Sequence, residues 1–186
     1  MTTCLLWFRQ DLRLTDNPAL LEATRSGLKI VPVYILDDDT SAEWKMGGAS
    51  RWWVHHSLKA LNASLSDSMV FRSGNAEVVI PALVKEFGAK AVYWNRCYEP
   101  WRIARDKKIK DVLTKNGVTA ESFNASLLWE PWTVSKQDGT PYKVFTPYFR
   151  RGCLGVGEPP EPKPCPKVIP LHIRQIPSDL DTLKLL

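Results

Sequence analysis

The sequence has few cysteines, and none lies in a motif where cysteine does chemistry. Cys4, Cys97, Cys153 and Cys165 form no C-x-x-C pair and have no histidine at a zinc-site spacing. This pattern excludes a disulfide framework and fits a reducing, cytoplasmic environment. There is no charged-then-apolar leader, and no apolar run approaches the roughly 20 residues that cross a bilayer. We therefore expect a cytoplasmic protein that has no membrane segment and binds no metal.

Phosphate-binding glycine loops are also lacking. Neither G-x-x-x-x-G-K-[ST] nor G-x-G-x-x-G occurs, which argues against a nucleotide-hydrolysing or adenylating enzyme. The net charge is only +5, and the whole excess of basic side chains lies in residues 94–186 without a concentrated patch. A duplex-binding face commonly neutralises about 6 to 10 phosphates from one patch. We do not expect this segment to bind DNA strongly by itself.

Short apolar runs alternate with helical patterns over the first 123 residues. Asn17 is a good N-cap with Pro18 at the first helical position, and Gly88 and Gly117 suit helix ends. Pro32 removes a ladder donor, so we expect it at the start of its strand or beside a bulge. The alternation predicts an α/β fold with a doubly wound, five-stranded parallel sheet in the order 3-2-1-4-5. Its expected strands are residues 3–8, 29–36, 68–72, 90–95 and 118–123.

The alternation stops at Asn124. Residues 133–136 and 142–145 flank an Asp-Gly turn and predict a small hairpin, followed by a short helix over 146–154. Seven of the fourteen prolines fall between residues 155 and 177, which is typical of an extended linker or wrapping arm. A linker that leads to no further element suggests that a second domain is missing. We divide the chain into an α/β domain, 1–132, and an extension of hairpin, short helix and linker, 133–186.

Charged residues follow the first two expected strands. Arg9, Asp11, Arg13 and Asp16 crowd the loop after the first strand, where they form either a structural ion-pair network or a site. Asp37-Asp38-Asp39-Thr40 follows the second strand. Three adjacent carboxylates could bind magnesium, but no further acidic ligand is fixed nearby, so a solvated turn is the favoured interpretation.

The helix that begins near Gly47-Gly48 carries an apolar stripe that should face the sheet: Val54, Leu58, Leu61 and Leu65. The remaining large side chains should point away from the sheet: Trp52, His55, His56 and Lys59. They either cover a returning segment of the chain or contact a ligand or partner. A large aromatic face rarely stays in water, so we favour packing beneath the C-terminal extension. Adjacent histidines do not readily share one metal ion.

A ligand site is expected where strand ends meet. In an open parallel sheet, ligands bind outside the carboxyl ends of the strands. Those ends carry Arg9–Asp11, Tyr34–Asp37 and Trp94–Glu99, with the Gly47-Gly48 helix start and Arg51 beside them. Aromatic walls, free amides and a guanidinium suit a planar, partly anionic molecule. A well-packed sheet edge without a ligand is the alternative.

The opening string resembles a known signature. Trp-Phe-Arg-x-Asp-Leu-Arg-Leu-x-Asp-Asn, residues 7–17, resembles the N-terminal signature of the DNA photolyase and cryptochrome family. Residues 47–58, 92–100 and 142–148 are similar to bacterial photolyases that repair cyclobutane pyrimidine dimers. The resemblance implies the N-terminal α/β domain, which holds a light-harvesting antenna chromophore. It also implies a larger helical domain, absent from this sequence, that binds FAD and the damaged DNA.

Several expectations come only with this resemblance. The helical FAD domain would be a partner in cis. The full-length protein would be a monomeric photolyase that acts on damaged DNA. The segment alone would be inactive and would have no catalytic residues. A cryptochrome-type blue-light signalling protein is the alternative. Arg9, Asp11 and Arg13 would brace the loop or form interdomain ion pairs.

The resemblance also implies positions for the antenna. The residues that would contact a deazaflavin or flavin-type antenna are Tyr34, Leu36, Met46, Arg51, Cys97 and Glu99. In deazaflavin-binding relatives we would expect an acid at the position of Cys97, and in folate-binding relatives an Asn-Glu pair in place of Trp101-Arg102. The departure from the folate pattern is larger, so a deazaflavin or flavin is preferred to a folate.

Overall fold

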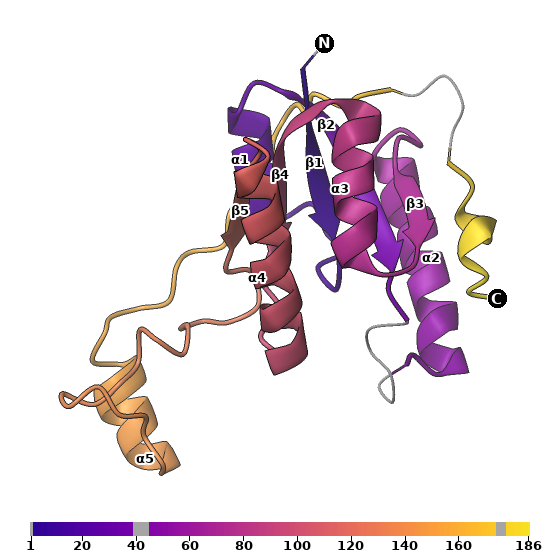
Figure 1. Cartoon of the computed structure of the whole chain (residues 1–186). Helices are drawn as coiled ribbons and strands as arrows, with labels where there is room; N and C mark the ends of the chain where they lie inside the picture. The colour runs from indigo at the N-terminus through magenta and orange to yellow at the C-terminus, as the bar shows by residue number, and fades with distance from the viewer. Residues whose placement is uncertain (1, 39–44, 174–177) are drawn as a thin grey trace.

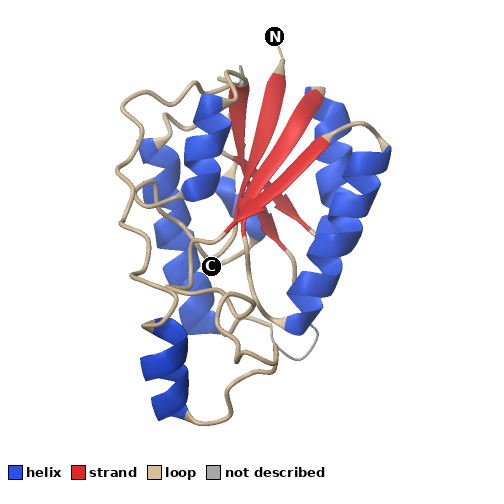
Figure 2. Ribbon diagram, turned by 90° about the vertical axis from the view of Figure 1, so that its left-hand side faces the viewer, coloured by secondary structure: helices blue, strands red, loops and turns tan. Residues whose placement is uncertain are grey.

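The chain folds around a five-stranded, all-parallel sheet with helices on both faces (Figures 1 and 2). The computed structural model describes residues 2–38, 45–173 and 178–186. The strand order is β3-β2-β1-β4-β5, so the predicted fold class and the order 3-2-1-4-5 are confirmed. The strands are β1 (Thr3–Phe8), β2 (Lys29–Leu36), β3 (Val70–Ser73), β4 (Ala89–Asn95) and β5 (Thr119–Phe123).

Two apolar cores sandwich the sheet. One face packs against α1 (Pro18–Arg25) and α2 (Gly48–Ser64), and the other packs against α3 (Ala76–Phe87) and α4 (Pro100–Lys115). Side chains alternate between the faces along each strand, as the pleat requires, so Leu6 joins the first core while its neighbours join the second. In the described ranges, no helix combines the length and apolar character needed to cross a membrane.

The local signals that start and stop the helices act as the sequence predicts. The side chain of Asn17 accepts a hydrogen bond from the backbone N–H of Leu20, and Pro18 occupies the first turn of α1. Asn75 caps α3 in the same way. Gly88 ends α3 with a φ of 58°, a left-handed conformation that glycine adopts without a steric penalty.

Pro32 lies inside β2, so its expected place at the strand start or beside a bulge was wrong. The N–H of Ile30 donates to the carbonyl of Pro170, on the outer side of β2. Backbone groups two residues apart in a strand face the same neighbour, so the nitrogen of Pro32 also faces this side. Pairing with β3 begins only at Val33, and the proline therefore interrupts no ladder there.

The predicted hairpin over 133–145 is also wrong. Backbone bonds from Gly139 to Lys136 and from Lys136 to Thr140 close the Asp-Gly turn, but no described strand flanks it. The residues on both sides of the turn instead pack against the helical segment that follows. This segment consists of α5 (Phe145–Pro147) and the π-helix η2 (Tyr148–Cys153), and it occupies the place of the helix expected over 146–154. A Cβ at Gly152 would lie only 2.6 Å from the Val134 side chain, so close side-chain packing replaces strand pairing.

The proline-rich segment runs back along the α/β domain as a wrapping arm, which was one of the two forms expected for it (Figure 1). The N–H of Asp16 donates to the carbonyl of Lys163 at 2.7 Å, and Leu171 forms a parallel bridge with Ile30. Ser178 then accepts a bond from the backbone of Phe71 on β3. The arm ends in η3 (Leu180–Leu183), which lies against β3 and α2, so it covers the exposed edge of the sheet.

The expected cover over the outer face of α2 is not formed. Trp52 remains 52% exposed, whereas Leu183 and Leu185 join the core that contains Leu58. His55, which was expected on the same outer face, is buried. The extension therefore packs on the apolar stripe of the helix and leaves its aromatic side open.

Replacing Leu183 with alanine tests whether the arm completes this core. Leu183 is only 3% exposed, and removing such a side chain typically costs about 2–5 kcal/mol of the free energy of unfolding. Urea denaturation should show that loss for Leu183→Ala and less than about 0.5 kcal/mol for Leu186→Ala, whose side chain is 72% exposed. Equal effects of the two substitutions would contradict the packing.

Candidate functional site

A cavity of about 620 Å³ lies at the carboxyl ends of β1 and β2. The loop after β1, the last residues of β2, the start of α2 and the first two turns of α4 enclose it. One part of the wall is apolar and aromatic: Tyr34, Leu36, Met46, Trp53 and Val54. The other part is charged: Arg9, Arg13, Asp37, Asp38, Arg102 and Arg105. This is the edge of the sheet where open α/β folds bind ligands.

Three of the six predicted contact residues line the cavity. Tyr34, Leu36 and Met46 contribute to the apolar wall. Arg51 lies outside the lining, forms an ion pair with Asp38 and donates from Nε to the carbonyl of Met46 at 3.2 Å. Arg51 therefore holds two lining residues in place instead of facing the cavity itself.

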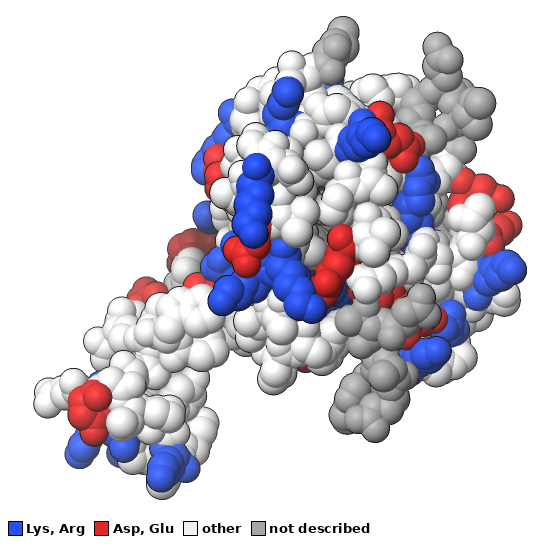
Figure 3. Space-filling model, viewed as in Figure 1, with Lys and Arg blue, Asp and Glu red and all other residues white. Residues whose placement is uncertain are grey.

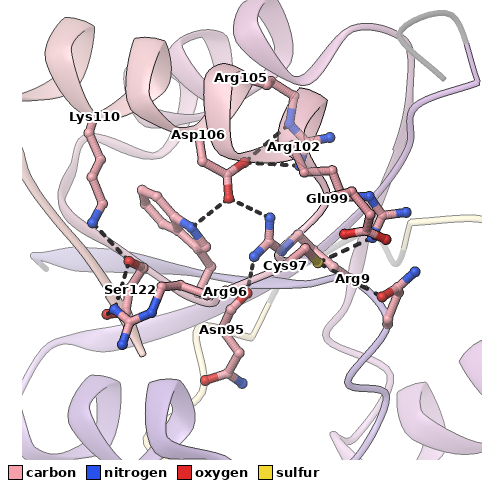
Figure 4. A network of polar contacts seen from close by, with 12 residues as sticks. Arg9, Asn95, Arg96, Cys97, Glu99, Arg102, Arg105, Asp106, Lys110 and Ser122 are labelled. Carbon is pink, nitrogen blue, oxygen red and sulfur yellow. Dashed lines mark hydrogen bonds and ion pairs between the residues drawn. The ribbon is translucent and has the colours of Figure 1, made fainter. Parts of the chain in front are cut away.

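The other two predicted residues, Cys97 and Glu99, contact Arg102 and are not part of the wall (Figure 4). Nη1 of Arg102 lies 3.1 Å from Sγ of Cys97 and 3.6 Å from a carboxylate oxygen of Glu99. Cys97 is also 3.9 Å from the side-chain oxygen of Gln10. Both residues thus act on the cavity through Arg102.

A buried ion-pair network ties the cavity to the sheet (Figure 4). The carboxylate of Asp106 on α4 lies 2.7 Å from Arg9 after β1 and 3.0 Å from Arg105. The indole nitrogen of Trp94 donates to the same carboxylate at 3.2 Å. Arg105 also pairs with Asp37 at the end of β2, at 3.2 Å. Since each charge has an opposite partner, the network can remain buried.

The favoured interpretation of the 37–40 segment as a solvated turn was wrong for its first two residues. Asp37 is buried against Arg105, and Asp38 is paired with Arg51. Asp39 and Thr40 lie outside the described residues. In the part of the chain that the structure describes, no group of three histidine, cysteine or acidic side chains is arranged to hold a metal ion.

The loop after β1 is braced from within. The carboxylate of Asp11 accepts bonds from the backbone N–H of Arg9 and from the side-chain amide of Asn95. Arg13 donates to the carbonyl of Ala125 at 2.7 Å and pairs with Asp16 at 3.5 Å. These contacts agree with the loop-bracing role that was expected, and an interdomain role remains a prediction.

Sequence reasoning placed Arg9 at the ligand edge but missed the stacking of basic side chains on Trp7 and Trp101, to which α4 contributes Arg105. The guanidinium carbons of Arg9 and Arg105 each lie 4.9 Å from the ring centre of Trp7. The guanidinium carbons of Arg102 and Arg105 lie 4.9 Å and 5.3 Å from the ring centre of Trp101. The i, i+4 spacing of Trp101 and Arg105 was a usable signal, because it places both on one side of a helix.

The wall has a surplus of hydrogen-bond donors. Among the described residues, three buried side-chain nitrogens have no partner: Trp7 Nε1, Arg9 Nε and Arg102 Nε. All three are N–H donors, and all three residues line the cavity. Buried donors normally find acceptors. A planar molecule with acceptor oxygens therefore complements this cavity better than a purely apolar one.

Tyr34 adds a neutral phenol to the apolar wall. Burial, and then the nearby carboxylate of Asp38, raise the pKa of Tyr34 to about 12. The hydroxyl accordingly keeps its proton at neutral pH and can donate a hydrogen bond.

Comparison with known proteins identifies the family. Residues 4–167 match the family model described as DNA photolyase. The chain belongs to the DNA photolyase family. It is 43% identical over 166 residues to a deoxyribodipyrimidine photo-lyase of Agrobacterium fabrum, an alignment that covers 88% of this chain and 34% of the relative. It is 37% identical to cryptochrome-1 of Arabidopsis thaliana, over 84% of this chain and 23% of that protein.

Solved structures of this family share the fold. A bacterial class III photolyase from Agrobacterium tumefaciens superposes with a TM-score of 0.88 and 40% identity, covering 100% of this chain and 39% of that protein. An archaeal photolyase from Sulfolobus tokodaii, described with two FAD molecules, has a TM-score of 0.75 at 22% identity and shows the fold alone. This chain thus spans about a third of the length of the photolyase relative from Agrobacterium fabrum.

Asp106→Asn tests the buried network. The substitution removes the carboxylate shared by Arg9 and Arg105, and breaking a buried pair from one side costs about 3–5 kcal/mol of the free energy of unfolding. The matched control is Glu86→Gln, whose pair with Arg72 is partly exposed and should contribute less than about 1 kcal/mol. Urea denaturation measures both, and a small loss for Asp106→Asn would refute the bracing role.

The raised pKa of Tyr34 predicts a late alkaline titration. An unfolded tyrosine ionises near pH 10, so the neutral phenol of the folded chain contributes stability that is complete below pH 10 and is lost as the pH rises toward 12. Tyrosinate absorbance of the chain and of Tyr34→Phe should be the same up to about pH 10 and diverge above pH 11. Divergence at pH 9 would contradict burial of this phenol.

Proposed function

We propose that this chain is the N-terminal, antenna-binding domain of a deoxyribodipyrimidine photolyase that repairs cyclobutane pyrimidine dimers in DNA under light. The observation that carries the proposal is the 43% identity to a photo-lyase across 88% of the chain. Since the chain spans about a third of that relative, repair is proposed for the longer protein, and the chain alone is proposed to be inactive.

The site supports the antenna role. A cavity of about 620 Å³ with an aromatic wall and unpartnered donors suits a planar chromophore that carries acceptor oxygens. When bound, such a chromophore absorbs light and passes the excitation to the flavin proposed for the rest of the protein. The residues of this chain hold and orient it: the apolar wall excludes water from the ring, and the network around Asp106 fixes the charged wall.

We propose a flavin or deazaflavin in preference to a folate. The basis is the sequence difference at Trp101-Arg102, where folate-binding relatives are expected to have an Asn-Glu pair. Arg102 adds a positive charge to the wall, which suits an anionic ligand rather than a cationic one, and the ring of Trp101 packs against this guanidinium.

The longer protein is proposed to join this domain to a helical FAD domain in cis. Residues 125–157, here named the projecting lobe, extend away from the sheet and carry exposed apolar side chains such as Phe145, which is 73% exposed (Figure 1). In Figure 3 the charged side chains of this lobe gather mainly at its lower end, and the surface between that end and the sheet is largely uncharged. Exposed apolar side chains gathered in one region are typical of an interdomain contact. We propose a cytoplasmic monomer that acts on damaged DNA through the full-length protein.

A cryptochrome-type signalling protein is the second candidate, because the chain is 37% identical to cryptochrome-1 of Arabidopsis thaliana. The longer protein that contains this chain distinguishes the two. Expressed in photolyase-deficient bacteria, a photolyase restores survival after ultraviolet damage only when the cells are then lit with blue light. Equal survival in light and darkness would favour the signalling protein.

Binding to the chain itself tests the antenna role. We expect FMN to bind more tightly than methenyltetrahydrofolate in equilibrium dialysis with absorption detection. Ser50→Trp should weaken binding, because it adds a large ring at a residue that lines the cavity, whereas Ser64→Trp on the exposed far end of α2 should not. Tighter folate binding would overturn the chromophore class, and equal effects of both variants would overturn the location.

A further inference from the structure

The charged wall of the cavity is unevenly neutralised. Of its four arginines, Arg9 and Arg105 share the carboxylate of Asp106, and Arg105 has Asp37 as a second partner. Asp38, the other acid of the wall, forms an ion pair with Arg51, which does not line the cavity. Each of these carboxylates is therefore already matched by a guanidinium group other than that of Arg13 or Arg102.

Arg13 is held by acceptors beside the cavity. Its guanidinium donates to the carbonyls of Thr15, Asp16 and Ala125 at 2.7–3.2 Å and forms an ion pair with the carboxylate of Asp16. These bonds occupy both Nε and Nη2 and fix the side chain against the loop after β1. Arg13 is thus already matched by one carboxylate and by three backbone carbonyls.

Arg102 is the least compensated cation on this wall. Its partners are the thiol of Cys97, a weak acceptor, and the carboxylate of Glu99 at 3.6 Å, which is 44% exposed. Its Nε is buried and has no acceptor among the described residues. A guanidinium whose acceptors are this weak is unfavourable in a partly buried place, and an oxyanion bound to it adds the charge partner that it lacks.

The position of Arg102 suits an anion rather than a neutral ring. It lies in the first turn of the 16-residue helix α4, where the free backbone N–H groups and the helix dipole also favour negative charge. Its guanidinium rests 4.9 Å from the ring centre of Trp101, which limits its freedom. The lining includes both this basic group and an apolar wall, so one molecule can place a ring and a charged group on different parts of it.

We infer that the cavity selects chromophores that carry a phosphate or carboxylate group, and that Arg102 is the specificity-determining residue that binds this group. The inference rests on the proposed antenna function and adds the charge class of the ligand. Of two molecules with the same ring, the cavity takes the anionic one. FMN and riboflavin form such a pair, because they differ only by a phosphate.

The two flavins provide the direct test. Equilibrium dialysis of the chain at low salt should show FMN binding about tenfold or more tighter than riboflavin, since a charge-assisted bond to a guanidinium is worth at least that factor. Raising the salt concentration should weaken FMN binding and leave riboflavin binding unchanged. Equal affinities overturn the inference while the antenna proposal stands, whereas no binding of either flavin overturns both.

Variants assign the preference to Arg102. In Arg102→Gln the preference for FMN should fall to within about twofold, and Arg102→Lys should keep part of it because the charge remains. Arg25→Gln is the matched control, since it removes the same charge from the exposed surface of α1 and should keep the full preference. A preference that survives in Arg102→Gln, with riboflavin affinity and circular dichroism unchanged, overturns the role of Arg102.

Discussion

The arrangement of the cavity depends on one buried carboxylate, that of Asp106. It joins Arg9, which follows β1, to Arg105 on its own helix, and it accepts a third bond from Trp94 on β4. Three elements from distant parts of the sequence thus meet at one acceptor. A buried carboxylate is unfavourable unless it is matched by charge and hydrogen bonds, so these partners must keep their positions together. This shared acceptor therefore fixes the charged side chains of the cavity wall relative to one another.

Polar pairing and apolar packing have separate roles in this fold. The two cores hold the sheet between its helix pairs and would be satisfied by many apolar side chains. The polar network is more selective, because Asp37, Arg105 and Asp106 match only in one arrangement of β2 against α4. Where every carboxylate is matched, an extra guanidinium such as that of Arg102 leaves a local excess of positive charge. The ligand chemistry proposed for the cavity follows from that imbalance.

The extension has a structural role and a proposed interaction role. Its last part closes the edge of the sheet and adds Leu183 and Leu185 to the core, so the α/β body depends on residues far along the chain. The projecting lobe, residues 125–157, does not join the core of the sheet. It buries a few side chains of its own, including Val134 and Cys153, and leaves other apolar side chains exposed. A family member that spans about a third of its relatives can present such a surface to the remaining part of a longer protein.

The sequence by itself determined the α/β class, the strand order, the helix cap at Asn17 and the family, because hydrophobic periodicity, capping chemistry and the opening signature are local. It also predicted that Tyr34 lies at the ligand edge, since strand ends meet there. Only the tertiary structure decided which charges pair and which side chains line the cavity, as with Arg102 in place of Cys97 and Glu99. Ion pairing depends on distances between residues far apart in the chain, and no local pattern encodes those distances.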